Sequence, residues 1–300
     1  MEKIEIVFVV LHYLTATDTL DCIQSIYKNI DTSSFRIVVV DNASPNDSYQ
    51  KLKSKTEYMN EVFLIRTEKN LGFANGNNFG IVYARKKWKI KYIAVINNDV
   101  QLMRGPFYEI IDEKYKETKF AVLGPMVLTR DGYCNTSPIS LDTPSQKQVE
   151  SEIRHFRRRR FINKYNLSKL YLFFLSIRDL FKKKQQNMKP LFEDQKGVCL
   201  NGCFLIFSER FFDKFDGLDN RTFMYFEEPI LLLHLKCNQL LSIYTPDIRI
   251  YHKECVSTNY DKQKIKDKVE FNCKNRYDSR KVYLEILREF GLYRDNESKW

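Results

Sequence analysis

Residues 4–48 decide the fold, and they read IEIVFVVLHYLTATDTLDCIQSIYKNIDTSSFRIVVVDNASPNDS. The apolar run from Ile4 to Leu11 is continuous, which is typical of a parallel strand buried on both faces. Thr17 or Asp18 is expected to cap a helix whose apolar side chains recur at helical spacing. A second buried strand, from Phe35 to Val40, ends at Asp41 and is followed by a polar loop. The stretch therefore predicts strand, helix, strand.

The alternation continues along the chain with a strand at Val62–Ile65, a loop over residues 67–78, a helix through Phe79 and a strand at Tyr92–Ile96. Alternating strands and helices predict a parallel sheet with right-handed crossovers. We therefore expect an α/β fold, with a Rossmann-like, mostly parallel central sheet flanked by helices. Ligands of such sheets bind beyond the carboxyl ends of the strands.

The 300 residues suit one large domain with additions. We expect one domain over residues 1–260, in two halves at about 1–125 and about 190–260. A basic insertion is expected at about 150–190, and a helical extension at 261–300. Later elements are predicted as helices at 106–117 and 208–215, strands at 120–123 and 243–251, and a long helix over 261–289.

Composition narrows the possible settings. No run of about 18 uncharged apolar residues occurs, so no membrane-spanning helix is expected, and the first residues read as a strand rather than a signal peptide. The seven cysteines are odd in number and form no CxxC pair, which argues against a disulfide framework or a zinc site. A cytoplasmic setting is expected.

Polar clusters at predicted strand ends are the first candidate site residues. Asp41 is placed to contact a base or ribose, although the residues alone favour a turn or cap aspartate. Asn97, Asn98 and Asp99 offer hard oxygen ligands that suit Mg²⁺ or Mn²⁺, although they are also ordinary turn residues. The glycines of the loop after residue 67 allow a ligand to approach the backbone closely.

Glu227 and Glu228 form the second candidate cluster. They lie in an apolar context that is expected to raise their pKa values, which suits a general base. Alternatively they cap the following helix, and both roles are compatible. His252, at the end of a predicted strand, is either structural or a partner of a carboxylate around Mn²⁺.

Six motifs in order resemble the family 2 glycosyltransferases, particularly a bacterial, rhamnosyltransferase-like branch of surface polysaccharide assembly. They are VVVDNASPNDS, NLGFANGNNFG, INND, NGCFLIF, FMYFEEPIL and IYHKECVST, and they span roughly residues 4–258. The resemblance implies the GT-A (nucleotide-diphospho-sugar transferase) fold, with a catalytic domain over residues 1–260 whose half at about 1–125 binds the donor and whose half at about 190–260 faces the acceptor. It also implies hexosyl transfer from a UDP- or dTDP-sugar, with Mn²⁺ or Mg²⁺, to a saccharide or lipid-linked acceptor.

The resemblance also assigns roles to residues. The expected nucleotide-sugar contacts are His12, Asp41, Asn70, Gly72, Asn78, Asn97 and Asn98. Asn97 and Asp99 occupy the outer positions of the family's DxD motif, so Asp99 and His252 are the expected metal ligands. Gly202 is expected on the acceptor side.

The family's acidic motif departs from its usual form here. Its usual Glu-Asp reads Glu227-Glu228, and Ile230 replaces a later Asp, so both glutamates are candidates for the base. We favour Glu228 over Glu227 as the base of an inverting displacement.

Most of the formal charge of +11 lies in residues 151–190. Basic clusters alternate there with aromatic and aliphatic residues, which is typical of a helix lying on an anionic membrane surface. We expect residues 154–184 to hold the protein peripherally on the inner face of the cell membrane. A solvated helical hairpin and a partner-binding surface are the alternatives, and no nucleic-acid partner is expected because no recognised nucleic-acid fold surrounds the basic run.

Rival functions remain open at this point. A substituted DxD motif and an altered acidic motif would also suit a catalytically decayed nucleotide-sugar-binding protein. A nucleotidyltransferase would share the sheet, but its Gly-rich phosphate loop is absent after the first strand, where the chain reads HYLTATDT.

Overall fold

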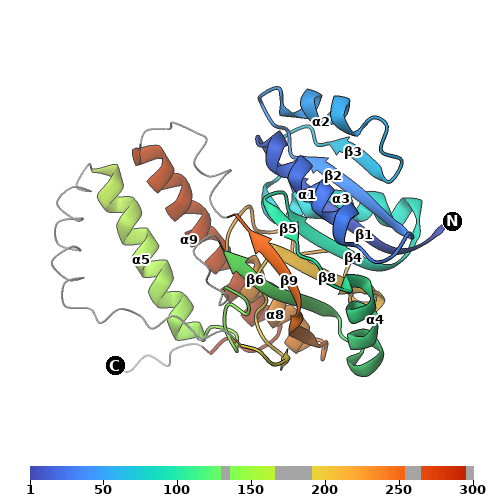
Figure 1. Cartoon of the computed structure of the whole chain (residues 1–300). Helices are drawn as coiled ribbons and strands as arrows, with labels where there is room; N and C mark the ends of the chain where they lie inside the picture. Colours follow the sequence, from blue (N-terminus) through green and yellow to red (C-terminus); the bar gives the residue numbers. More distant parts are fainter. Residues whose placement is uncertain (130–135, 166–190, 254–264, 295–300) are drawn as a thin grey trace, which may run out of the picture.

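The computed structural model describes residues 1–129, 136–165, 191–253 and 265–294. These residues form one central sheet with helices on both faces (Figure 1). The strands are β1 (Lys3–His12), β2 (Phe35–Asp41), β3 (Val62–Arg66), β4 (Lys89–Asn97), β5 (Val100–Leu102), β6 (Val122–Thr129), β7 (Gln195–Lys196), β8 (Phe204–Ser208) and β9 (Ser242–His252). The helices are α1 (Ala16–Asn29), α2 (Ser48–Thr56), α3 (Gly72–Lys87), α4 (Phe107–Thr118), α5 (Gln146–Lys164), α7 (Glu209–Phe212), α8 (Glu227–Cys237) and α9 (Ile265–Glu289).

The strand order is β3-β2-β1-β4-β8-β6-β9-β5, with β7 beside β9. From β3 to β4 every pair is parallel, as the sequence predicted. Beyond β4 the sheet is mixed, because β8 runs antiparallel to both β4 and β6, while β6 and β9 are parallel. The expectation of a mostly parallel sheet therefore holds for the first half only. The second half of the sheet is not built from consecutive strand–helix–strand units, so its strands are not required to be parallel.

The alternating side chains of β1 explain the layers. Ile6, Phe8 and Val10 pack with α1 and α4 on one face of the sheet. Val7 and Val9 pack with α3, α7 and α8 on the other face. Full burial of such side chains stabilises the fold by about 1.5–3 kcal/mol each. The continuous apolar run is thus a strand buried on both faces, as predicted.

Helix starts differ from the predictions. α1 begins at Ala16 after Thr15, not after Thr17 or Asp18. α3 begins at Gly72, so much of the predicted loop is helical. Its asparagines bond across the structure, as when Asn75 donates to the carbonyl of Asn220, and such tertiary bonds override weak helix propensity. α2 was not predicted, because its only buried apolar residue is Leu52.

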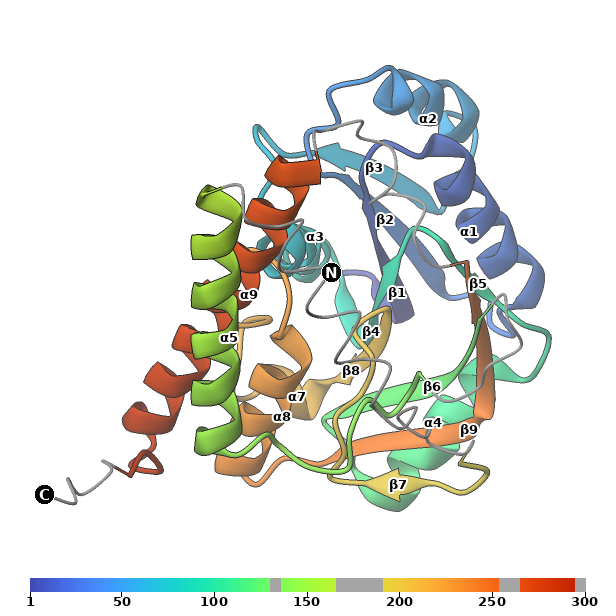
Figure 2. The same ribbon diagram turned by 90° about the vertical axis from the view of Figure 1, so that its left-hand side faces the viewer.

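Helices α5 and α9 lie side by side, as Figures 1 and 2 both show. Arg160 of α5 pairs with Glu270 of α9 at 2.7 Å, and Arg280 of α9 pairs with Glu152 of α5. A third apolar cluster joins the two helices to α8. α5 is the described part of the predicted basic insertion, whereas residues 166–190 lie outside the described residues. In the described ranges, no helix has the length and apolar run that crossing a bilayer requires.

Candidate functional site

Asp99 and His252 meet at the end of β4. The residue after Asp99, Val100, opens β5 and pairs in register with His252 of β9. Oδ1 of Asp99 lies 3.2 Å from Nε2 of His252, and the two side chains are 10% and 15% exposed. Nδ1 of His252 is buried and has no hydrogen-bond partner among the described residues. The structure thus brings together the two residues expected to bind a metal.

This pair suits a divalent cation only in part. A carboxylate oxygen and an imidazole nitrogen that face each other are donors that Mn²⁺ accepts. Within the described ranges, however, no third His, Cys, Asp or Glu joins such a group. Mg²⁺ and Mn²⁺ commonly bind through one or two protein ligands and complete their shell with substrate phosphates and water. The pair fits that kind of shared site.

Lys253 places a cation beside this pair, and sequence reasoning missed it. Its backbone N–H donates to the carbonyl of Asp99 over 3.0 Å. Its ammonium donates to Asp18 at 2.8 Å and to Asp21 at 2.7 Å. Burial lowers the pKa of Lys253, but the hydrogen bonds to these carboxylates outweigh burial and raise it above the usual range. Its position directly after His252 was the only sequence signal.

Asn98 forms structural hydrogen bonds in this arrangement, and its role as a nucleotide-sugar contact stays a prediction. Its side chain is buried and donates to the hydroxyls of Thr15 at 2.9 Å and Thr19 at 3.1 Å. These bonds tie the end of β4 to the start of α1. Asn97 remains partly exposed, and its backbone N–H donates to the carbonyl of Cys203 over 2.9 Å. Of the two asparagines, Asn97 is therefore the more exposed.

Glu228 reaches the same edge of the sheet from α8. Because β8 runs antiparallel to β4, its first residues lie beside the last residues of β4. Cys203 bonds to Asn97 there, and the N–H of the neighbouring Gly202 donates to Oε1 of Glu228 over 3.3 Å. The expected acceptor-side glycine, Gly202, is therefore in contact with the expected base, Glu228. The residue after Gly202, Cys203, bonds to Asn97 of the INND motif.

The two glutamates have different surroundings. Glu227 is buried, and its Oε1 accepts a hydrogen bond from the Thr222 hydroxyl at 3.1 Å. Burial, followed by the charge of Glu228, raises the pKa of Glu227 to about 7. Burial also raises the pKa of Glu228, against opposing hydrogen bonds from its own N–H and that of Gly202, and against the charge of Arg276. Glu228 is the more exposed of the two.

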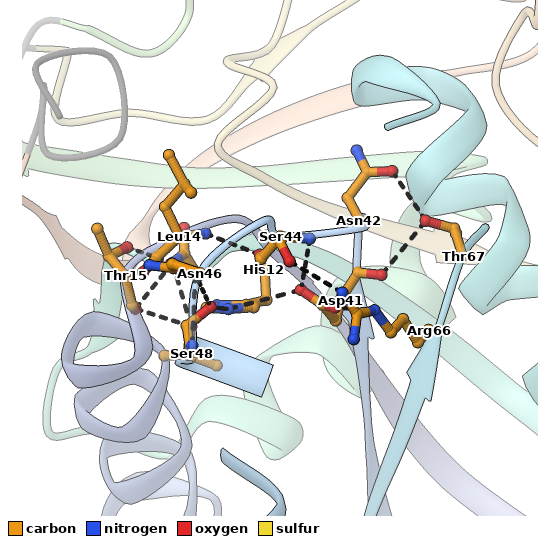
Figure 3. Close-up of polar contacts among 12 residues, drawn as sticks. His12, Leu14, Thr15, Asp41, Asn42, Ser44, Asn46, Ser48, Arg66 and Thr67 are labelled. Atoms are coloured by element: carbon orange, nitrogen blue, oxygen red, sulfur yellow. Dashed lines mark hydrogen bonds and ion pairs between the residues drawn. The ribbon is translucent and has the colours of Figure 1, made fainter. Parts of the chain in front are cut away.

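His12 and Asp41 lie side by side at the ends of β1 and β2, and both are fully buried. Nε2 of His12 bonds to the hydroxyl of Ser48 at 3.0 Å (Figure 3). Nδ1 bonds to the hydroxyl of Thr19 at 2.7 Å. Burial, opposed by the charge of Asp41, lowers the pKa of His12 to about 4, so this ring is neutral at neutral pH. Direct contact of His12 with a ligand does not fit this burial.

Arg66, which sequence reasoning missed, covers Asp41. Its Nε lies 3.0 Å from Oδ2 of Asp41, and its side chain is 41% exposed (Figure 3). The other carboxylate oxygen accepts from the N–H of Ser44 at 3.2 Å. In this structure a ligand reaches Arg66 before Asp41. The role of Asp41 as a nucleotide contact stays a prediction. Arg66 directly follows the predicted strand at Val62–Ile65, and in the structure it pairs with Asp41 across β3 and β2. Its place at a strand end was the sequence signal that could have identified it.

Asn70, Gly72 and Asn78 hold backbone in place. Oδ1 of Asn70 accepts from Asn42 at 3.1 Å and from the N–H of Gly72 at 2.9 Å. Gly72 has a φ of +78°, and a Cβ there would lie 2.0 Å from the carbonyl oxygen of Phe223. The amide of Asn78 bonds to both backbone groups of Leu218 at 2.8 Å. Gly72 and Asn78 thus anchor the segment that leads to Glu227, and the role of Asn78 as a donor-sugar contact stays a prediction.

Known proteins similar to this chain point to one family. The family model described as glycosyl transferase family 2 matches residues 7–184. A low-salt glycan biosynthesis hexosyltransferase, Agl10, of Haloferax volcanii is 23% identical over 73% of this chain and 58% of its own length. An N-acetylglucosaminyl-diphospho-decaprenol L-rhamnosyltransferase of Mycobacterium tuberculosis is 26% identical over 75% of this chain and 68% of its own length. The chain thus spans a little over half of the first relative.

Solved structures show the fold. The crystal structure of GalNAc-T7 with UDP, GalNAc and Mn²⁺ superposes with a TM-score of 0.56 at 12% identity, over 83% of this chain and 44% of the other. S. aureus TarS superposes with a TM-score of 0.52 at 11% identity, over 83% of this chain and 37% of the other. These likenesses confirm the expected GT-A fold. Because the family model matches more than half of the chain, the chain belongs to glycosyl transferase family 2.

Proposed function

We propose that this protein transfers a hexosyl group from a UDP- or dTDP-sugar to a saccharide or lipid-linked saccharide during cell-surface polysaccharide assembly, with inversion and with a divalent cation. The observation that carries the proposal is the placement of Asp99, His252, Gly202 and Glu228 at one edge of the sheet. GalNAc-T7 with its UDP and Mn²⁺, and the rhamnosyltransferase with its diphospho-decaprenol acceptor, support these substrate classes by analogy.

Glu228 is the general base of the proposed reaction. It accepts the proton of the acceptor hydroxyl, whose oxygen forms a bond to the anomeric carbon while the bond from that carbon to the diphosphate breaks. Its raised pKa suits this role, because a base with a pKa nearer the working pH accepts the proton more readily. Asp99 and His252 would hold Mn²⁺ or Mg²⁺, which offsets the charge of the leaving diphosphate when bound.

A thermal-shift screen tests the donor site. UDP, dTDP, GDP, CDP and CMP are each added with and without Mn²⁺, because a ligand that binds only the folded state raises the melting temperature. The expected result is a shift with UDP or dTDP that needs Mn²⁺ and is lost in Asp99→Ala. A folded protein that responds to none of these nucleotides would contradict the proposal and favour a decayed or interaction-based role.

Helix α5 supports peripheral attachment to the inner face of the cell membrane. Arg154, Arg157 and Arg158 are exposed on it, as are Phe161 on the helix and Tyr165 directly after it, at 59% and 54%. Exposed arginines beside exposed aromatic rings suit a surface of anionic headgroups. The rest of the expected segment, residues 166–184, lies outside the described residues.

Sedimentation with phosphatidylglycerol vesicles tests this attachment. Replacing Arg154, Arg157 and Arg158 by Gln is expected to weaken binding roughly 100-fold, at about 1 kcal/mol per charge. The matched control replaces Lys51, Lys53 and Lys55, which are exposed on α2, by Gln and removes the same charge. Equal loss in both triple variants would indicate general charge attraction and not docking of α5.

A further inference from the structure

The turn before the two glutamates has an unusual backbone. Tyr225 and Phe226 have φ values of 73° and 74°, and Phe226 is the N-cap of α8. Residues with a side chain rarely adopt this left-handed conformation, because Cβ crowds the following carbonyl. Two such residues in succession persist only where surrounding contacts hold them. Those contacts fix the direction in which Glu227 and Glu228 leave the turn.

The contacts come from the C-terminal helix. The hydroxyl of Ser279 donates to the carbonyl of Met224 over 2.9 Å. The phenol of Tyr225 donates to Oδ1 of Asn272 over 2.8 Å, and the guanidinium carbon of Arg276 lies 4.2 Å from the centre of the same ring. Both distances suit direct interactions.

Phe226 is held in the same way. The guanidinium of Arg280 lies 4.2 Å over its ring, and the ring of Tyr283 is 5.5 Å away. The five contacting residues share one face of α9, because their spacing follows helical periodicity: Asn272, Arg276, Ser279, Arg280 and Tyr283. Arg280 is itself fixed by Glu152 of α5, so α5 braces the helix that holds the turn.

Arg276 differs from its neighbour Arg280. Arg280 has a carboxylate partner, whereas Arg276 forms no ion pair with any residue in the described ranges. Its positive charge acts on Glu228 and lowers the pKa of that carboxyl against the effect of burial. Arg276 therefore touches the turn through Tyr225 and reaches the proposed base through its charge.

We infer that α9 positions the proposed base: Asn272 and Arg276 hold the left-handed turn at Tyr225, which fixes Glu228 against Gly202. This inference rests on the proposed function for the role of Glu228, but the contacts themselves do not. Asn272 and Arg276 are positioning residues, since they act through Tyr225 and through charge and not on the reacting atoms.

Hydrogen exchange of the full chain tests the inference without turnover. Asn272→Ala and Arg276→Met are expected to speed exchange in the peptide covering residues 223–230 about tenfold or more. Tyr225→Phe, which keeps the ring and loses only the hydroxyl, is expected to give a smaller increase. Lys274→Gln, on the exposed side of the same helix, is the matched control and leaves exchange unchanged. Exchange that is unchanged in all three variants overturns the inference.

A pH profile tests the charge of Arg276. Release of nucleoside diphosphate is followed with UDP-glucose, UDP-galactose, UDP-N-acetylglucosamine and dTDP-rhamnose. Arg276→Met is expected to move the acidic limb of kcat to higher pH, because loss of the positive charge raises the pKa of Glu228, while Arg276→Lys keeps the limb. If the acidic limb of kcat lies at the same pH in Arg276→Met and Arg276→Lys, the charge of Arg276 does not act on Glu228. If the unchanged chain uses no donor, the proposed function fails, and hydrogen exchange still decides whether α9 holds the turn.

Discussion

The backbone N–H of Gly202 donates to Oε1 of Glu228, and a Cβ at position 202 would lie 2.7 Å from that same oxygen. Gly202→Ala therefore pushes the carboxylate aside. Turnover is expected to fall about tenfold to 100-fold, because small displacements of a reacting group are costly. The melting temperature should change little, because a side-chain tip moves more easily than backbone. Gly105→Ala, where a Cβ meets nothing within 4 Å, is the control. Equal activity of the two variants would mean that contact with Gly202 is immaterial.

Gly72 also lies close to another part of the chain, the backbone carbonyl of Phe223. Gly72→Ala is expected to destabilise the protein by about 3 kcal/mol, because a clash with the Phe223 carbonyl adds to the cost of a left-handed φ. Gly197→Ala has a similar φ of +71° but open space, so it should cost only about 1 kcal/mol. Denaturant unfolding of both variants gives the difference. Similar losses would show that φ alone accounts for the effect.

The division of roles between the glutamates is testable by kinetics. Glu228→Gln is expected to lower kcat by about 100-fold to 10,000-fold, because the proposed general base is lost, while the proposed binding of UDP with Mn²⁺ is expected to persist. Glu227→Gln keeps an acceptor for the Thr222 hydroxyl and should lower kcat far less. The assignment would be reversed if Glu227→Gln caused the larger loss.

Glu227 should also make stability depend on pH. Its folded-state pKa of about 7 lies above the ordinary glutamate pKa of 4.5, so the folded protein holds this proton more tightly than the unfolded chain. Its contribution is therefore most favourable below pH 4.5 and is lost as pH rises to about 7. Relative to the unchanged protein, Glu227→Gln is expected to gain on the order of 3 kcal/mol of unfolding free energy between pH 4.5 and pH 8. Parallel stability curves would contradict this pKa.

Local patterns in the sequence predicted the first half of the fold well. The apolar run of β1 and the later apolar runs needed only burial and periodicity to be recognised as strands. The order of the motifs also predicted that Asp99 and His252 share a site, and they lie 3.2 Å apart. Both predictions depend on strand ends, which a parallel sheet places at one edge.

Amide and backbone partners that are distant in sequence could not be predicted. Asn98 and Asn78 looked like ligand contacts, yet they bond to Thr15 and Leu218, which no local pattern connects to them. The antiparallel direction of β8 could not be predicted either, because its partner β4 lies about 100 residues earlier in the sequence. The charged sequence of α9 likewise gave no sign that one of its faces holds the turn at Tyr225.

The packing of α9 against that turn has a consequence for synthesis. Strand β2, which ends at Asp41, and strand β4, which ends two residues before Asp99, leave the ribosome early and have their sheet partners nearby in the chain. The left-handed turn at Tyr225 and Phe226 gains its partners only when Tyr283 has emerged. A nascent chain can therefore assemble the strands of its first half well before Glu228, the proposed base, acquires its final orientation.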